Sequence, residues 1–194
     1  EFSTPDLKMF DLCGHVRSAE IVATSPSSGA YLDPDYVSFT EDGTIESLKL
    51  EFDTFKFDAD KKHMTKDTFK YIVLRDNDNR MTSWEITNAP QGYPEGYMNY
   101  TITWDSNGKV SEIGFFYDEG NPNMIATYNE KGLLEKQFMS GMDRLTYTYT
   151  YTDFDSHGNW TKRQVKCYID DGADGQLEDT YNETRHITYY DSNE

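Results

Sequence analysis

The sequence predicts an all-β protein, an antiparallel meander of repeated β-hairpins in a single sheet whose degree of curvature the sequence leaves open. Three observations predict this fold. Aromatic residues supply much of the apolar surface, one polar turn motif recurs five times, and no segment has the apolar stripe of an amphipathic helix. We expect about ten strands from the spacing of the turns.

The composition favours strands over helices. Only 36% of the 194 residues are hydrophobic, yet aromatic residues make up 15% of the chain, with 15 Tyr and 11 Phe. Large rings are enriched in strands because they pack well on a pleated, half-buried surface. A chain of this length buries a substantial core, and we expect one all-β domain over residues 1–194, with residues 1–10 as an N-terminal tether.

One polar turn motif punctuates the chain five times. Four copies contain an aromatic residue, then Asp, Asn or Thr, two polar residues, Gly, one further residue and an apolar residue. In the remaining copy, Arg75 replaces the aromatic residue and Asn79 replaces Gly. The five copies span Phe39–Ile45, Arg75–Met81, Trp104–Val110, Tyr128–Leu134 and Phe154–Trp160.

The chemistry of this motif is that of a β-hairpin. A type I turn favours Asp or Asn at its first position, where the side chain accepts a backbone hydrogen bond. A following residue with positive φ forms a G1 bulge and restores the twist of the strands. Gly adopts that conformation without strain and Asn tolerates it, so all five copies predict the same turn.

Three other segments connect the hairpins. Pro26 to Pro34 is expected to be a loop, and so is Thr87 to Gly96, which contains two Pro and two Gly. The stretch from Asp58 to Phe69 lacks a clean apolar stripe at helical spacing. We interpret it as a hairpin connection or a short helical turn.

The turn at Asp155–Asn159 fixes the register of the hairpin that contains the Tyr-Thr repeat. Counting outward places the threonines on the side of the turn aromatics, opposite polar residues. The tyrosines lie on the other side, in the pairs Tyr151:Arg163, Tyr149:Val165 and Tyr147:Cys167, followed by Leu145:Ile169. Because this second row is much more apolar, we expect it to be buried or half-buried.

Exposed rings are the candidate binding residues. Phe154 faces Trp160 on the threonine side, so these two rings are expected to be accessible to a sugar ring or a peptide. Tyr147, Tyr149 and Tyr151 are further candidates, with core packing as the alternative interpretation. In the hairpins around Gly108 and Gly132 the turn-aromatic side is instead the apolar one. Rings on both faces of a sheet would indicate a partner protein or dimer packing, unless a bulge changes the buried side.

Three stretches resemble a known family: DLCGHVRS at 11–18, YTYTYTDFDSHGNWTKR at 147–163 and ETRHITYY at 183–190. They resemble secreted bacterial β-meander proteins with YD-repeat (RHS-like) hairpins, a largely uncharacterised group, over about Asp11 to Tyr190. The resemblance implies an extracytoplasmic protein that is periplasmic, secreted or a surface lipoprotein, its signal peptide removed. It implies no catalytic residues.

The charge of −17 restricts the partners. Nucleic acids and anionic membranes attract basic surfaces, so neither is expected as a partner. No apolar run is long enough for a transmembrane helix. The remaining partner classes are an unidentified protein and a glycan.

The segment IDDGADGQLEDT at 169–180 partly matches a calcium loop. Asp170 and Asp174 occupy the first and fifth ligand positions, and Glu178 adds a carboxylate. Gly172 stands where the third-position ligand belongs, and Tyr181 replaces the bidentate Glu. An acidic loop without a metal is the alternative, and we expect no other cofactor.

Cysteine and histidine chemistry gives no further site. Cys13 and Cys167 could form one disulfide, but a meander would separate them, which favours two thiols. His157 lies inside a turn, where adjacent Asp, Ser and His do not have the convergent geometry of a triad. We therefore expect a non-catalytic extracytoplasmic binding or scaffold module. The alternatives are a carbohydrate-binding module that uses exposed aromatics and a hydrolase with an unrecognised carboxylate pair.

Overall fold

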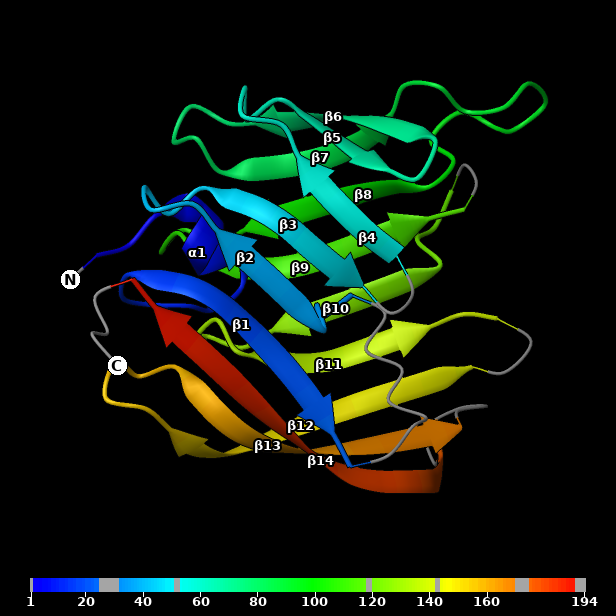
Figure 1. Ribbon diagram of the computed structural model, residues 1–194. Coiled ribbons are helices and arrows are strands. Elements are labelled where there is room, and N and C mark those ends of the chain that lie inside the picture. The colour runs from blue at the N-terminus through cyan, green and yellow to red at the C-terminus, as the bar shows by residue number, and fades with distance from the viewer. Residues whose placement is uncertain are drawn as a thin grey trace.

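The chain folds as a closed antiparallel barrel of fourteen strands, shown as a computed structural model in Figure 1. The structure describes residues 2–24, 32–50, 53–117, 120–141, 144–169 and 175–190. The elements in chain order are α1 (Pro5–Met9), β1 (Val16–Ala23), β2 (Tyr36–Phe39), β3 (Ile45–Leu50), β4 (Asp53–Phe57), β5 (His63–Lys66), β6 (Phe69–Arg75), β7 (Met81–Ile86), β8 (Asn99–Trp104), β9 (Val110–Phe116), β10 (Met124–Tyr128), β11 (Leu134–Met139), β12 (Leu145–Phe154), β13 (Trp160–Ile169) and β14 (Gln176–Tyr189).

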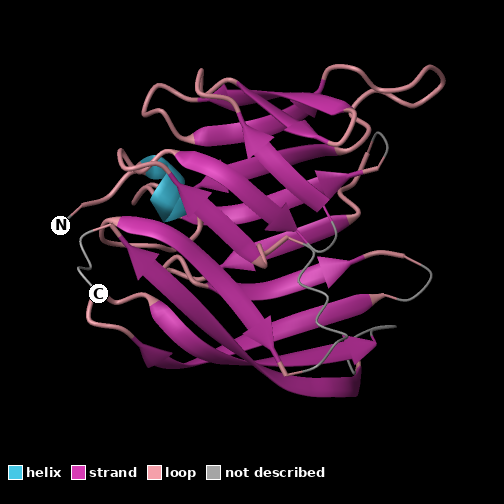
Figure 2. Cartoon of the chain, viewed as in Figure 1, coloured by secondary structure: helices cyan, strands magenta, loops and turns pink. Residues whose placement is uncertain are grey.

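The predicted meander is confirmed, but it closes on itself. Every strand pairs with its neighbours in the chain, and β1 pairs with β14 from Val16–Tyr189 to Ala23–Glu183. The expectation of about ten strands in a single sheet, with its curvature left open, therefore missed both the closure and the number of strands. A twisted sheet of this many strands tends to curl, and closure leaves no exposed edge that could pair with another chain. Figure 2 shows strands on both the near and far walls.

All five predicted turns are present. Positive φ angles occur at Gly43 (75°), Asn79 (62°), Gly108 (73°), Gly132 (82°) and Gly158 (84°). In the turn that contains Gly108, Asp105 Oδ1 accepts hydrogen bonds from the backbone N–H groups of Asn107 at 2.8 Å and Lys109 at 2.9 Å. A register shift adjoins each turn, as expected for a bulged hairpin.

The connecting segments largely follow the prediction. The stretch from Asp58 to Phe69 contains β5 and forms hairpin connections, with no helix in it. The segment 87–96 is the long β7–β8 connection, which projects from the barrel in Figure 1. Of the expected loop between Pro26 and Pro34, residues 26–31 lie outside the described residues.

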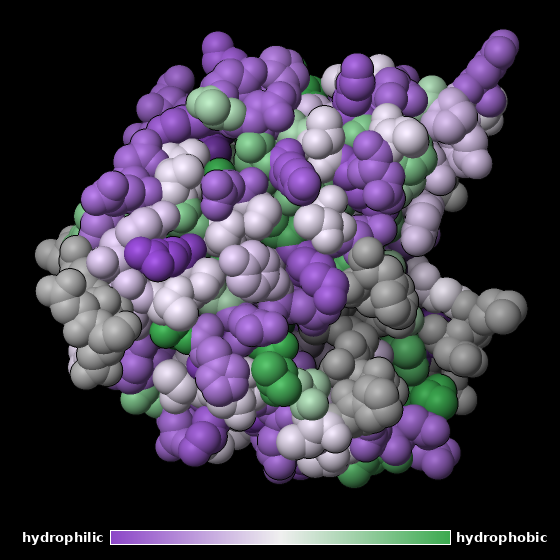
Figure 3. Space-filling model, viewed as in Figure 1, coloured by the Kyte–Doolittle hydropathy of each residue, from purple (hydrophilic) through white to green (hydrophobic). Residues whose placement is uncertain are grey.

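An apolar core fills much of the barrel interior. Phe55 is fully buried, and its ring lies 5.8 Å from Tyr71 and 6.0 Å from both Trp84 and Tyr100, measured between centroids. Alternate residues of each strand point inward, which is how a period of two gives one apolar and one polar side. The outer rows are polar, as with Lys162, Gln164 and Lys166 of β13, and Figure 3 shows a largely hydrophilic outer face in the view of Figure 1.

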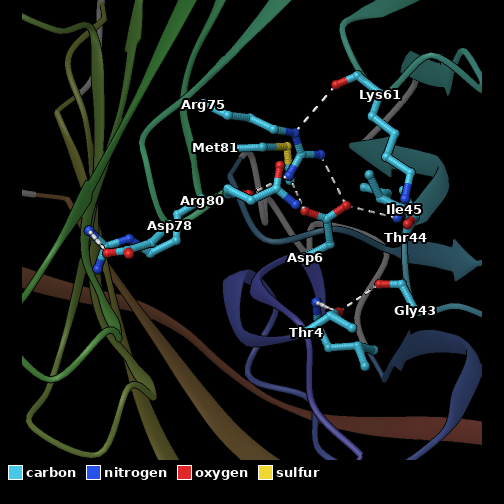
Figure 4. A network of polar contacts seen from close by, with 12 residues as sticks. Thr4, Asp6, Gly43, Thr44, Ile45, Lys61, Arg75, Asp78, Arg80 and Met81 are labelled. Carbon is cyan, nitrogen blue, oxygen red and sulfur yellow. Dashed lines mark hydrogen bonds and ion pairs between the residues drawn. The ribbon is translucent and has the colours of Figure 1, made fainter.

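The segment Pro5–Met9, which was expected to belong to a tether at residues 1–10, instead forms a helix that packs into the core. Thr4 caps α1, and Leu7 and Met9 are buried in the core cluster. Asp6 fixes the helix: Arg75 donates to both of its carboxylate oxygens, at 2.6 and 3.1 Å, and the backbone N–H of Ile45 donates at 3.0 Å (Figure 4). Apolar burial and this buried ion pair hold the segment in place, which its sequence alone does not reveal.

Two further sequence questions have plain answers. Cys13 and Cys167 are both thiols, as the meander favoured. Within the described residues, no helix is long and apolar enough to cross a membrane.

Candidate binding groove between β11 and β12

An open groove of about 810 Å³ lies between the β10–β11 turn and the second half of β12. Its lining is rich in rings, with charged residues beside them: Tyr128, Tyr149, Tyr151 and Phe154, and Glu130, Lys131 and Glu135. Apolar and aromatic walls with a few polar groups are typical of sites for small ligands, and the size is in the range of such sites. The groove is therefore the candidate binding site.

The groove forms because two neighbouring hairpins differ in length. Strand β12 has ten residues, but its ladder with β11 pairs only Leu145–Thr148 with Met139–Lys136. In the described chain this ladder does not continue past Thr148, whereas β12 stays paired with β13 as far as Phe154. The wall therefore separates beyond Thr148, and the groove lies at this separation.

Two tyrosines hold the separated strands together. Tyr151 Oη donates to the backbone carbonyl of Leu134 at 2.9 Å, and Gln137 Nε2 donates to Tyr149 Oη at 2.5 Å. Burial raises the pKa of both phenols above the ordinary value, so they stay neutral at physiological pH. The rings of the groove floor are thus fixed by hydrogen bonds across the gap.

The rim of the groove is exposed and acidic. Phe154 is 50% exposed, and its ring centroid lies 6.4 Å from that of Tyr151. Glu130 and Glu135 are exposed on the opposite side, with Lys131 between them in sequence. A ligand in the groove would meet ring surfaces and carboxylate acceptors together.

A buried layer of stacked cations supports the tyrosines. The guanidinium carbon of Arg163 lies 4.5 Å from the ring centroid of Tyr149 and 4.3 Å from that of Trp160. Arg163 donates to Glu183 at 2.6 Å and is also bonded to Asp33. Burial opposes its charge, but the two carboxylates hold the pKa of Arg163 well above its ordinary value. Such a buried cation needs both partners.

A second arginine continues this layer towards α1. The guanidinium carbon of Arg185 lies 4.1 Å from the centroid of the Trp160 ring, which therefore contacts both arginines. Arg185 also donates hydrogen bonds to the carbonyls of Trp160, Phe10 and Asp11 at 3.0–3.2 Å. An internal cavity of about 20 Å³ adjoins Asp11, Arg163 and Arg185, which is room for about one water. Burial raises the pKa of Asp11 to about 7, with the Arg185 charge opposing it.

The barrel resembles a porin-like protein in fold. That protein, from Bacteroides uniformis, superimposes with a TM-score of 0.52 at 12% sequence identity, over 91% of this chain and 98% of that chain. At this identity the likeness shows the fold alone. No family model matches the chain, so the resemblance to YD-repeat proteins stays a prediction. No curated protein matches the chain either.

The structure divides the predicted site residues. Tyr149, Tyr151 and Phe154 line the groove, whereas Tyr147 is 3% exposed and packs with Val165, Cys167 and Tyr181. The tyrosine pairs were predicted in the correct register. The expectation of an accessible Trp160 was wrong, because this side chain is only 2% exposed.

An extra register shift explains the error at Trp160. The pairing of β12 with β13 shifts twice, between Tyr151 and Asp153 and again between Asp153 and Phe154. Simple alternation across this segment assigns Trp160 to the threonine side, but the shifts return it to the tyrosine side. Tyr147 and Trp160 are therefore both buried in the barrel interior, whereas Tyr149 and Tyr151 also line the groove. A sheet with rings on two solvent faces is not needed. Dimer packing stays a prediction.

The calcium hypothesis remains a prediction. Asp170 and Asp174 lie outside the described residues, and Glu178 is exposed on β14.

Sequence reasoning missed the acidic rim and the partners of Arg163. Tyr128 was assigned only as a turn aromatic, and Glu130 and Glu135 have no distinguishing motif. One signal was available: the predicted pair Tyr151:Arg163 places a cation in an apolar row, which requires a buried counter-charge. Asp33, which is 130 residues away in sequence, could not be identified from that signal.

Proposed function

We propose that this protein is a non-catalytic, extracytoplasmic binding module whose ligand occupies the groove between β11 and β12. The observation that carries the proposal is an open hollow of about 810 Å³ lined by four rings on a closed barrel. Binding sites are concave, and their rings provide contact area at low conformational cost. Three of the lining rings, Tyr149, Tyr151 and Phe154, belong to the hairpin that contains the Tyr-Thr repeat.

The packing of the barrel supports an external site over a central one. The interior between β7 and β10 is filled by apolar side chains, and the cavity beside Arg163 has room for about one water. The outer rows of β13 and β14 are polar, whereas barrels that cross membranes present an apolar band to lipid. Both features favour a protein that presents its ligand site to water.

The strongly perturbed acids support a non-catalytic role. Burial raises the pKa values of Asp11 and Glu183, but both lie in the layer beneath the tyrosines, and Glu183 is neutralised by Arg163. A general acid needs a raised pKa and contact with the substrate at once. Burial also raises the pKa of Asp35, which does not line the groove. A hydrolase acting in the groove would have to use the carboxylates that line it, Glu130 and Glu135.

The extracytoplasmic location rests on two resemblances. The sequence resembles exported bacterial proteins with YD-repeat hairpins, and the fold resembles a protein described as porin-like. Fractionation of the source cells, with an antibody against the barrel, tests this location. Recovery in the cytoplasmic fraction would contradict it.

A binding screen with paired variants tests the function. The wild-type barrel is applied to glycan and peptide arrays, and each hit is repeated with Phe154→Ala and with Tyr93→Ala. Tyr93 is a suitable control because it is 49% exposed and lies in the β7–β8 connection, away from the groove residues. We expect hits that Phe154→Ala weakens and Tyr93→Ala does not. Hits that neither variant changes, or mass-spectrometric evidence that the protein cleaves a bound glycan, would overturn the proposal.

A further inference from the structure

We propose that the groove between β11 and β12 selects an uncharged oligosaccharide and rejects anionic glycans. This inference rests on the proposed function, and it assigns a ligand class and a basis for selectivity to the same site.

The rings provide surfaces for sugar units. The face of an aromatic ring is electronegative and attracts polarised C–H bonds, which a pyranose ring presents on its flat faces. The rings of Tyr151 and Phe154 lie 6.4 Å apart with an interplanar angle of 37°, so adjacent units of a chain can contact different rings. Phe154 has no polar atom, and its 50% exposure leaves the ring accessible.

The rim provides hydrogen-bond acceptors at the edge of these rings. Glu130 and Glu135 are exposed carboxylates, and Thr150 adds a hydroxyl on the β12 side. Hydrogen bonds from hydroxyls to carboxylates are stronger than those between neutral groups. Stacking faces beside acceptors match a ligand with apolar faces and hydroxyl-bearing edges, which distinguishes a sugar from a purely apolar ligand.

Charge decides against acidic glycans. The charged residues that line the groove, two glutamates and Lys131, give a net charge of −1, and the whole chain carries −17. Lys109 Nζ donates to the Glu130 carbonyl at 3.0 Å, and its charge offsets part of the repulsion on that side. A uronate or sulfate in the groove would lie within a Debye length of about 8–10 Å from these carboxylates, where repulsion is only partly screened. Neutral sugars are not repelled by the rim carboxylates, and their hydroxyl groups can donate hydrogen bonds to them.

The buried layer makes the platform rigid. Tyr151 is hydrogen-bonded to the Leu134 carbonyl, and Tyr149 is hydrogen-bonded to Gln137. The guanidinium carbon of Arg163 lies 4.5 Å from the centroid of the Tyr149 ring. Rings already fixed in place lose little conformational entropy when a ligand binds. Arg163 thus acts as a positioning residue for the groove, although it does not line it.

Isothermal titration calorimetry at fixed ionic strength tests the selectivity. The probes are cellohexaose, maltohexaose and mannohexaose as neutral glycans, the galacturonate hexamer as the anionic glycan, and a Lys- and Tyr-rich peptide. We expect at least one neutral glycan to bind and the galacturonate hexamer not to bind. Phe154→Ala should weaken the neutral glycan about tenfold, as for a central aromatic contact, while Tyr93→Ala leaves it unchanged.

A charge-reversal variant tests the basis of the selectivity. Glu135→Lys should lower the preference for neutral over anionic glycan, because it changes the sign of one rim charge while every ring remains. Binding of galacturonate or peptide in a Phe154-dependent manner, without any neutral glycan, would overturn the inference and leave the proposed function standing. If no probe or array hit depends on Phe154, both are overturned.

Discussion

Two sides of one barrel close around different interiors. From β7 to β10 the inward residues are apolar, with Trp84, Ile102, Ile113 and Phe115 packed in one cluster. From β11 to β14 the inward rows include Gln137, Arg163, Glu183 and Arg185. The same hairpin motif builds both sides. Apolar packing is non-directional and seals the wall, whereas buried charges need partners at defined positions, and the groove opens on that polar side.

We expect loss of one buried charge on the polar side to destabilise the barrel more than loss of one buried methylene on the apolar side. Arg163→Met should lower the free energy of unfolding by about 3–5 kcal/mol, because Glu183 and Asp33 lose their buried counter-charge. On the apolar side, Ile113→Val should cost about 1 kcal/mol. Urea denaturation measures both.

Lys162→Met is the matched control for this experiment. Lys162 is adjacent to Arg163 in sequence and pairs with Asp153 at 3.0 Å, but both side chains are more than half exposed. Such a pair contributes about 0–1 kcal/mol. If Arg163→Met is no more destabilising than Lys162→Met, the buried network does not hold the polar side together.

The polar side should also carry a distinctive pH dependence. Burial raises the pKa of Asp11 from 3.8 to about 7, so the folded state retains a proton that the unfolded state releases. The stability from this group is complete below about pH 4 and is lost as pH rises through 7. Asp11→Asn should therefore gain stability relative to wild type between pH 5 and 8, on the order of 2 kcal/mol. The charged groups around Asp11 are Arg185, Asp33, Lys109 and Arg163.

Denaturation of wild type and Asp11→Asn at several pH values measures the difference in their free energies of unfolding. Groups that titrate equally in both proteins cancel in this difference. Asp105 gives a control of opposite sign, since backbone hydrogen bonds lower its pKa and its contribution is lost as pH falls. A constant difference between Asp11→Asn and wild type across the range would show that Asp11 binds the same number of protons in the folded and unfolded states, so that folding does not raise its pKa.

The smallest expected change in stability concerns the separation between β11 and β12. Tyr151→Phe removes the hydrogen bond to the Leu134 carbonyl but keeps the ring, so it should cost about 1 kcal/mol. Hydrogen exchange should become faster at β11 and the second half of β12, with no change between β7 and β10. If Tyr151→Phe changed the exchange rates equally on both sides of the barrel, this tyrosine would have no specific role in holding the groove.

Much of the fold could be read from the sequence because its rules are local. Turn chemistry identifies Gly43, Asn79, Gly108, Gly132 and Gly158, since only the turn conformation of adjacent residues matters. Alternation then gives the register from Tyr151:Arg163 to Leu145:Ile169, because side chains on a strand change sides at every residue. The candidate rings Tyr149, Tyr151 and Phe154 follow from the same hairpin.

The features of the fold that the sequence did not predict depend on contacts between distant segments. Closure requires β1 to meet β14, and no local signal specifies how far a twisted meander curls. Trp160 points inward because of two register shifts. Arg163 is hydrogen-bonded to Asp33, which is 130 residues away in sequence. The sequence determined the hairpins and their registers through short-range sterics and hydrogen bonds. Only the tertiary structure decided the barrel, the buried cations and the groove, because each needs segments that are brought together by folding.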